Sequence, residues 1–312
     1  MAFRDQILCL KPETTSGTLE SLTGSDAIQV GQFTPTVQDF SAVERTVIGS
    51  RPGVVKAAAM AERKIGFEVP FEFAGSGTAG VAGGIHHLML MAGFNAATVA
   101  NTSITYSQAW PPSATTYSVG MFVDGQRYAG AGCRASALSI SAKAGEFLQA
   151  SATIMGLYRA PTTEANPSPT FPAQAAPVLF NSAGVASGTV TLGGVSLCLA
   201  EYEISIENTT VLYDHAGCTP HIEFTDRQVT GSITFARPAL ATLDAFANAA
   251  ASTLAALVMP VGTAAGNICT FNHPSIQLGA IELVDIDGKP GLKAPFTQVA
   301  AAANQEFNIV IT

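Results

Sequence analysis

The sequence predicts a mainly β (α+β) protein that consists of two similar halves, each with one α-helix. Three observations support this prediction. Several segments alternate apolar and polar residues with a period of two, which is typical of half-buried strands. Asp-Gly and other turn pairs separate these segments. A proline-rich stretch lies near the middle of the 312 residues, and similar elements follow in the same order on both sides of it.

The N-terminal 25 residues are polar and rich in turn formers, so we interpret residues 1–25 as an arm outside the core. The first half, 26–159, begins its regular pattern with a strand at 65–71, where every second residue is apolar. Residues 85–92 then have helical spacing up to Gly93, which is a helix-ending signal. Strands at 119–123 and 138–141 follow, with an Asp124-Gly125 turn between them.

A linker is predicted at 160–177, because five prolines there favour extended backbone without regular structure. The second half, 178–312, has strand patterns at 197–207, 232–235, 281–286 and 307–311. Apolar residues at helical spacing from Leu240 to Leu257 predict one helix that ends before Pro260.

The two halves match weakly in sequence. Segment 61–73 aligns with segment 225–237 at a spacing of 164, which pairs Arg63 with Arg227 and Phe71 with Phe235. Later, Glu146-Phe147 resembles Glu306-Phe307 at a spacing of 160. This order predicts a tandem duplication of one unit.

The composition favours a protein that other subunits cover on several sides. Charged residues make up 12% of the chain and hydrophobic residues 47%, and the mean hydropathy is +0.30. The surface of a monomer of this size normally carries more charged residues. We therefore expect other subunits to cover part of the surface. The net charge of −8 disfavours sequence-specific nucleic-acid binding, because such binding usually needs a basic face.

Other classes of protein are disfavoured as well. The apolar content is too high for disorder. The longest apolar run, 239–261, is interrupted by polar residues and by Pro260, so no membrane span is predicted. Residues 1–6 lack the order of a signal peptide, so we expect synthesis in a cytoplasm. The five cysteines are widely spaced and contain no CxxC pair, which predicts reduced thiols.

Three stretches of turns and strands follow one another in a distinctive order. The first runs from Arg63 through the Gly75–Gly80 turn to Phe94, the second covers 105–127, and the third covers 132–158. In this order they resemble the tail tube proteins of long-tailed, siphovirus-like bacteriophages. The resemblance extends over most of 27–160 and more loosely over the remainder. It implies two tandem tail-tube modules, each a β-sandwich or barrel with a flanking helix, that close into rings and stack into a hollow tube.

The resemblance also implies partners and a location. The chain would assemble with itself, as trimeric rings if each chain carries two modules and alternatively as hexameric rings. Tape measure, terminator and distal tail proteins would be further partners in the virion, and genome DNA would pass through without sequence-specific contacts. A structural role of this kind implies no catalytic, cofactor or metal residues.

Two sets of residues are candidates for this function. In strand 199–207, Glu201, Glu203 and Glu207 share one face, and Glu68 and Glu72 are their counterparts in the first half. An acidic channel wall repels DNA phosphates, so we expect these five side chains to face the channel. The long loop 44–62 is the second candidate, with Glu44, Arg45 and Arg51 as contacts to a neighbouring ring or protomer.

Two other functions stay open at this point. Residues Gly75–Gly80 match the G-x-G-x-x-G pattern of nucleotide-binding enzymes, but no acidic residue follows at the required spacing. An adhesive β-sandwich is the other alternative. His215, Cys218 and His221 have a spacing that could bind a metal, but a fourth ligand is missing nearby, so polar loop residues are the preferred interpretation.

Overall fold

The computed structural model describes residues 5–44, 58–186, 188–300 and 306–312. The protein is mainly β, as predicted, with two short α-helices. The first half contains β1 (Ile7–Pro12), β2 (Ala27–Ile28), β3 (Thr36–Val43), β4 (Ala59–Glu72), α1 (His86–Met91), β5 (Phe94–Val99), β6 (Ser103–Gln108), β7 (Tyr117–Val123), β8 (Gln126–Lys143) and β9 (Gln149–Thr163). The second half contains β10 (Thr191–Leu192), β11 (Val195–Ser196), β12 (Leu199–Tyr213), β13 (His221–Ala236), α2 (Ala245–Ala250), β14 (Leu254–Val261), β15 (Cys269–Leu278), β16 (Glu282–Ile286), β17 (Lys289–Gln298) and β18 (Asn308–Ile311).

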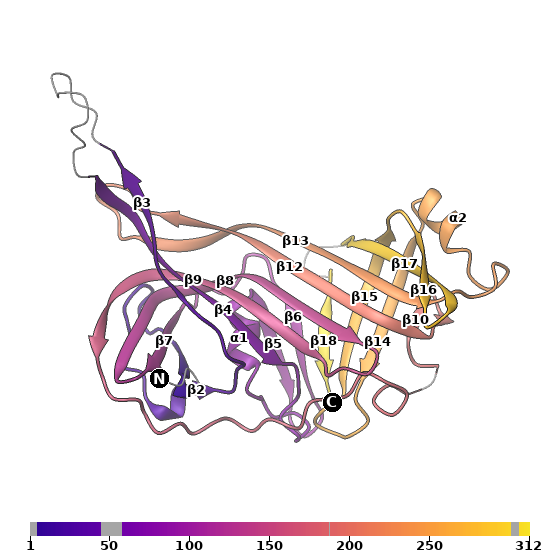
Figure 1. Cartoon of the computed structure of the whole chain (residues 1–312), viewed down its shortest axis with the longest axis horizontal. Coiled ribbons are helices and arrows are strands. Elements are labelled where there is room, and N and C mark those ends of the chain that lie inside the picture. Colours follow the sequence, from indigo (N-terminus) through magenta and orange to yellow (C-terminus); the bar gives the residue numbers. More distant parts are fainter. Residues whose placement is uncertain (1–4, 45–57, 187, 301–305) are drawn as a thin grey trace.

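Eight strands form one continuous layer that crosses both halves, which we call the long sheet. Its order is β3-β4-β9-β8-β12-β13-β17-β16, and every neighbouring pair is antiparallel. Figure 1 shows β8, β9, β12 and β13 running side by side along the long axis of the molecule. The pairing of β8 with β12 joins the two halves over seven residue pairs, from Glu201–Lys143 to Glu207–Ala137.

The strand order of the long sheet repeats. The first half contributes β3-β4-β9-β8 and the second contributes β12-β13-β17-β16, each as two hairpins in the same arrangement. This repeat supports the predicted duplication and makes β4 the counterpart of β13. The match of Glu146-Phe147 with Glu306-Phe307 is wrong, because β9 lies beside β4 whereas β18 lies between β6 and β15 in another layer.

A second layer of shorter strands packs against the long sheet. Its order is β5-β6-β18-β15-β14-β10-β11, so it also crosses from one half to the other. Strand β1 extends the edge of β7, which pairs with the first part of β8. The halves therefore share their sheets, although the boundaries 26–159 and 178–312 stay a prediction.

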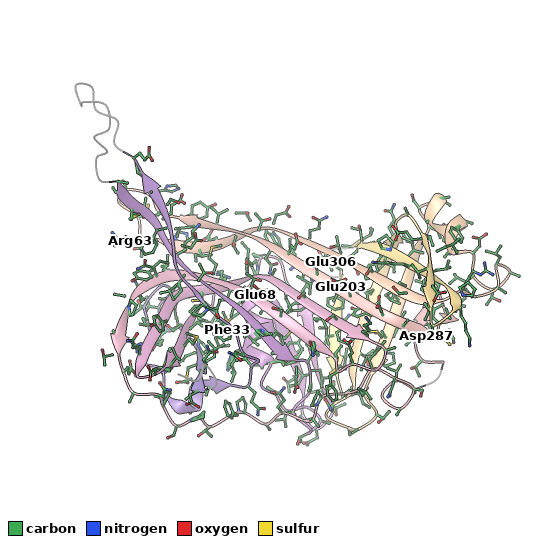
Figure 2. The ribbon with its side chains drawn as sticks, in the orientation of Figure 1. Phe33, Arg63, Glu68, Glu203, Asp287 and Glu306 are labelled. Carbon is green, nitrogen blue, oxygen red and sulfur yellow. The ribbon has the colours of Figure 1, made fainter. Side chains whose placement is uncertain are left out.

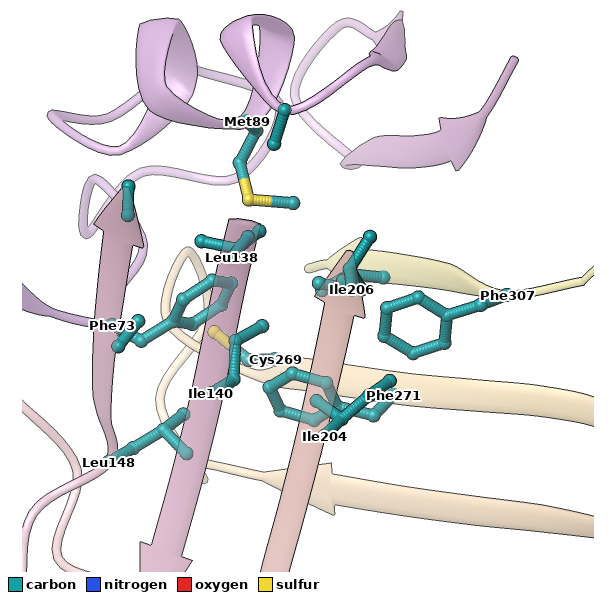
Figure 3. Packing of buried hydrophobic residues seen from close by; sticks show 14 of the residues in the cluster. Phe73, Met89, Leu138, Ile140, Leu148, Ile204, Ile206, Cys269, Phe271 and Phe307 are labelled. Carbon is teal, nitrogen blue, oxygen red and sulfur yellow. The ribbon is translucent and has the colours of Figure 1, made fainter. Parts of the chain in front are cut away.

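One hydrophobic core fills the space between the layers. Leu138 and Ile140 of β8 lie opposite Ile206 and Ile204 of β12. Figure 3 shows these four side chains beside Phe271 and Phe307, with Met89 of α1 above them. Because both halves contribute to this cluster, the 160–177 stretch does not separate two cores.

The interpretation of residues 1–25 as an arm outside the core is corrected by β1. Leu8, Cys9 and Leu10 are at most 2% exposed, and the strand pairs with β7 over its full length. The apolar run at 7–10 is short and is followed by many turn residues, so the local sequence does not predict a strand there. The strand forms because it pairs with β7, far along the chain.

The helix predicted over 240–257 is also wrong in extent. The structure has a helix only at 245–250, and residues 254–261 form β14, which pairs with β15 and β10. Leu257, Met259 and Val261 are buried with a period of two. The linker is predicted at 160–177, but it starts at residue 164 in the structure because β9 continues to Thr163. Residues 164–177 then contain no helix or strand.

None of the described helices is long and apolar enough to cross a membrane.

Candidate functional site

The outer face of the long sheet carries the five glutamates that the sequence singled out. Glu68 and Glu72 lie on β4, and Glu201, Glu203 and Glu207 lie on β12. Their strand neighbours, such as Val69 and Ile204, point into the core and are fully buried. Figure 2 shows Glu68 and Glu203 on the two halves of the sheet. We call this surface the polar face.

Cross-strand register places these glutamates in common rows, because directly opposite residues in antiparallel strands lie on one side of the sheet. One row contains Glu72, Gln149, Ser141, Glu203 and Ser232. A second row contains Glu68, Thr153, Ala137, Glu207 and Gln228. The rows continue across the β8–β12 pairing without interruption, so the two halves present one surface of small polar and acidic side chains.

A third row carries both signs of charge: Lys143, Glu201, Thr234, Lys293 and Glu282. Lys143 Nζ lies 3.6 Å from Glu201 Oε1, so this glutamate is partly neutralised. Asp39 and Lys64 form a similar pair at 3.6 Å on β3 and β4. Glu72 and Glu203 are three strands apart, about 14 Å, so salt screens their mutual repulsion. The polar face is therefore acidic without strongly destabilising the sheet.

Side-chain hydrogen bonds join the two halves in addition to the β8–β12 strand pairing. Asn208 of β12 is 5% exposed, and its Nδ2 donates to the carbonyls of Ala92 and Ala135 at 3.0 and 3.1 Å. Arg227 of β13 donates from Nη1 to the carbonyl of Ala109 at 3.0 Å. The second-half hairpin β12–β13 therefore holds the end of α1 and the end of β6 in the first half.

Arg134 of β8 strengthens the same join from the other side. Its Nε donates to the carbonyl of Ile222 at 3.0 Å, and its guanidinium lies 5.0 Å from the centre of the Phe224 ring. Burial lowers the pKa of this arginine. Since arginine stacks well on aromatic rings, the contact fixes the β13 end of the hairpin on the first half.

The long sheet has two edges that pair with nothing in the described parts of the chain. Strand β3 pairs only with β4, and β16 pairs only with β17. Leu283 of β16 lies opposite the buried Leu292 and so points toward the core side, yet it is 68% exposed. Exposed edges with apolar side chains are normally covered in soluble proteins.

The second predicted site is only partly visible. Glu44 follows β3 and is exposed. Arg45 and Arg51 lie outside the described residues. The predicted loop 44–62 is too long, because β4 already begins at Ala59. Figure 1 shows the ends of β3 and β4 extending beyond the body of the molecule, beside the β12–β13 hairpin.

The Gly75–Gly80 turn packs against the second half. The Gly75 N–H donates to Asn267 Oδ1 at 2.7 Å, and the Gly77 N–H donates to the carbonyl of Gly266 at 3.1 Å. A Cβ at Gly75 would lie 2.1 Å from the carbonyl oxygen of Gly266. The glycines thus permit close backbone contact, which accounts for the pattern without a nucleotide.

His215, Cys218 and His221 do not converge on one point. His221 stacks on Tyr213 with ring centres 5.3 Å apart, and its Nε2 lies 3.4 Å from Glu223. Among the residues that the structure describes, no group of three or more His, Cys, Asp and Glu side chains could hold a metal ion.

The sequence missed the residues that join the halves. Asn208, Phe224 and Arg134 contact partners between 73 and 116 residues away along the chain, which local patterns do not reveal. One signal was available: Asn208 continues the apolar series Tyr202, Ile204, Ile206 on the buried face, and a buried amide needs partners.

A layered sheet with one polar face, one shared core and two open edges is typical of a structural protein that assembles into larger bodies. A family model described as phage tail tube protein matches residues 4–303, nearly the whole chain. The protein therefore belongs to the phage tail tube family and is a structural component of the phage tail. No curated protein matches the chain.

Proposed function

We propose that three copies of this chain close into a ring and that the rings stack into the tube through which DNA leaves the phage. The observation that carries this proposal is the repeated four-strand unit, with an open edge at each end of the long sheet. Each chain then supplies two of the six units of the ring. Six chains would be needed only if each chain held one unit.

The direction of the strands is compatible with closure. All seven neighbouring pairs of the long sheet are antiparallel, so its eight strands leave β3 and β16 running in opposite directions. Strand β16 of one copy can therefore pair with β3 of the next in the antiparallel sense. Such a ring removes every open edge of the long sheet.

The polar face is the proposed channel wall. Its acidic side chains include Glu68, Glu72, Glu203 and Glu207, and its lysines are near carboxylates. Phosphate contacts to Lys or Arg hold DNA through counterion release. A wall of carboxylates and small hydroxyl groups offers few such contacts, so DNA slides along it without sequence preference.

The connection between β3 and β4, which contains Glu44, Arg45 and Arg51, is the proposed contact between successive rings. Other tail proteins would meet the two ends of the stack. These include a length-determining tape measure, a terminator and a distal tail protein.

Electron microscopy of the purified chain, combined with native mass measurement, tests the proposal. We expect annular particles or tubes whose smallest ring has the mass of three chains. A ring of six chains would contradict the two-unit interpretation. Particles that stay monomeric at all concentrations and salt conditions would contradict self-assembly, and a map with the β4–β12 glutamates on the outer wall would reject the channel assignment.

A further inference from the structure

The two long hairpins, β3–β4 and β12–β13, share the same register at several residue pairs. Asp39 lies opposite Lys64 and Ala42 opposite Met60, while Glu207 lies opposite Gln228 and Thr210 opposite Phe224. For these pairs the spacing between the two hairpins is 168 on the first strand and 164 on the second. Each hairpin also has a register shift beside these pairs, near Ser41 in one and Thr210 in the other. Arg63 therefore corresponds to Arg227, and Met60 to Phe224.

The β12–β13 hairpin uses these two positions to hold the first half. Arg227 reaches the carbonyl of Ala109, and its side chain is only 6% exposed. The Phe224 ring lies beside Gly93, where a Cβ would be 3.6 Å from it. Both residues thus occupy the space between the end of α1 and the end of β6.

The second half has a matching place. Helix α2 ends at Ala250 and is followed by Ser252 with φ of 52°, as α1 is followed by Gly93 with φ of 84°. Gln277 lies opposite Leu254, the first residue of β14, as Gln108 lies opposite Phe94, the first residue of β5. Leu278 is therefore the counterpart of Ala109.

That place is an open pocket in the single chain. Its volume is about 380 Å³, and it is lined by Phe246, Ala249, Ala250 and residues 278–281. Phe246 is 40% exposed, and Leu254 and Leu283 nearby are 50% and 68% exposed. We call it the α2 pocket.

The β3–β4 hairpin carries apolar side chains that stay exposed in the single chain, although Met60 and Arg63 lie at the rim of an open pocket beside Leu157 of β9. Met60 is 52% exposed and Val43 54%. Arg63 is exposed, and Figure 2 shows it near the projecting end of β4. In the described parts of the chain, its guanidinium forms no ion pair. The α2 pocket lies at the opposite end of the molecule (Figure 1), so one chain cannot bring the two together.

We infer that Arg63 and Met60 of one copy enter the α2 pocket of the neighbouring copy and repeat the contacts that Arg227 and Phe224 make within the chain. This inference rests on the proposed ring and specifies its interface. Strand β3 then pairs with β16 as β12 pairs with β8, and Leu283 becomes covered. Met60 fills the apolar pocket, and the Arg63 guanidinium donates to backbone carbonyls at the end of β15. Asp285, on the same side of β16 as Leu283, supplies negative charge nearby.

Crosslinking between copies tests the contact. Cys198 and Cys218 are exposed and are first replaced by serine, whereas the other three cysteines are buried. Met60→Cys and Ala250→Cys are then combined in one chain and treated with a short bis-maleimide. We expect covalent dimers and trimers. The matched control combines Ala250→Cys with Asp5→Cys, an exposed position on the first half away from the hairpin, and should stay monomeric on a denaturing gel.

The outcomes separate the contact from the ring. Rings or tubes that assemble without the Met60–Ala250 crosslink would overturn the inference and leave the proposed function standing. A chain that never assembles would overturn both.

A charge reversal tests the arginine separately. Arg63→Glu should leave the melting temperature of the monomer unchanged and raise the concentration needed for assembly at least about tenfold, since it removes charge-assisted hydrogen bonds. Lys143→Glu changes the charge equally at an exposed position on β8, away from both edges of the long sheet, and should assemble normally. Normal assembly of Arg63→Glu would show that this arginine does not enter the pocket.

Discussion

Arg227 and Glu306 form the shortest ion pair described, with 2.6 Å between Nη2 and Oε2. The arginine side chain is 6% exposed and the glutamate side chain 26%. Because the same guanidinium also donates to the carbonyl of Ala109, it links β13, the end of β6 and the segment just before β18. The three segments meet where the two halves of the chain pack together.

Breaking this pair should destabilise the protein. Glu306→Gln leaves the nearly buried Arg227 without a charged partner, and we expect a loss of about 2 kcal/mol of unfolding free energy, less than for a fully buried pair because Glu306 keeps some water. Glu201→Gln is the control, since the Lys143–Glu201 pair is exposed and should contribute less than about 1 kcal/mol. Urea unfolding of the monomer measures both, and equal losses would contradict the assignment.

Acid should destabilise the fold through His273. Burial lowers its pKa to about 4, below the usual 6.5 of a histidine, and its ring nitrogens bond to Tyr202 Oη at 2.9 Å and Gln298 Oε1 at 2.8 Å. The unfolded chain binds a proton below about pH 6.5 while the folded chain does not, so this contribution is complete above pH 6.5 and declines as the pH falls toward 4.

The expected decline is at most about 1.4 kcal/mol per pH unit from this group. Unfolding measured from pH 7 to pH 4 in the wild type and in His273→Gln gives the difference, and the variant should have the shallower slope. A variant slope equal to that of the wild type would mean that His273 is not the responsible group.

The Gly75 turn predicts a steric effect. Gly75→Ala brings a methyl group into the carbonyl of Gly266, so we expect at least about 2 kcal/mol of destabilisation. Gly66→Ala on β4 has its nearest neighbour at 3.6 Å and should change stability by less than about 0.5 kcal/mol. Thermal melting compares the two. Saturable binding of a nucleotide that protects the turn would instead favour the enzyme alternative.

The polar face predicts how DNA behaves in an assembled tube. Glu203→Lys on β12 should let tubes retain short duplex DNA at low salt and release it as salt rises, because phosphate contacts are then available. Asp5→Lys makes the same charge change away from the long sheet and should retain no more DNA than the wild type. Cosedimentation of labelled DNA with the tubes measures retention, and equal retention by both variants would place Glu203 away from the channel.

The sequence predicts the local parts of this fold well. The alternation in β4 and β12 is regular, so their faces, and with them the five glutamates, follow from the pattern of residues. The α1 helix is also predicted, since Gly93 marks its end and has φ of 84°. In each case the decisive information lies within about ten neighbouring residues.

The remaining features depend on partners far along the chain. Leu257 fits both the helical series that starts at Leu240 and the strand series Leu257, Met259 and Val261, and only the pairing with β15 and β10 decides between them. Lys143 becomes the partner of Glu201 because β8 meets β12, which no local pattern specifies. The match between Arg63 and Arg227 follows from the sequence. Only the structure shows that Arg227 holds the first half, and so suggests a role for Arg63.

The β8–β12 pairing has a consequence for how a ring would nucleate. This contact is already made when a single chain folds, at the very high effective concentration that a covalent connection provides. Three separate bodies rather than six would then have to meet, so fewer translational and rotational degrees of freedom are lost during closure. In a ring of six units, three junctions lie within chains and three lie between chains, so the two kinds can differ in sequence and strength. The junction within the chain forms when the monomer folds, whereas the junction between chains forms only when the chains polymerise.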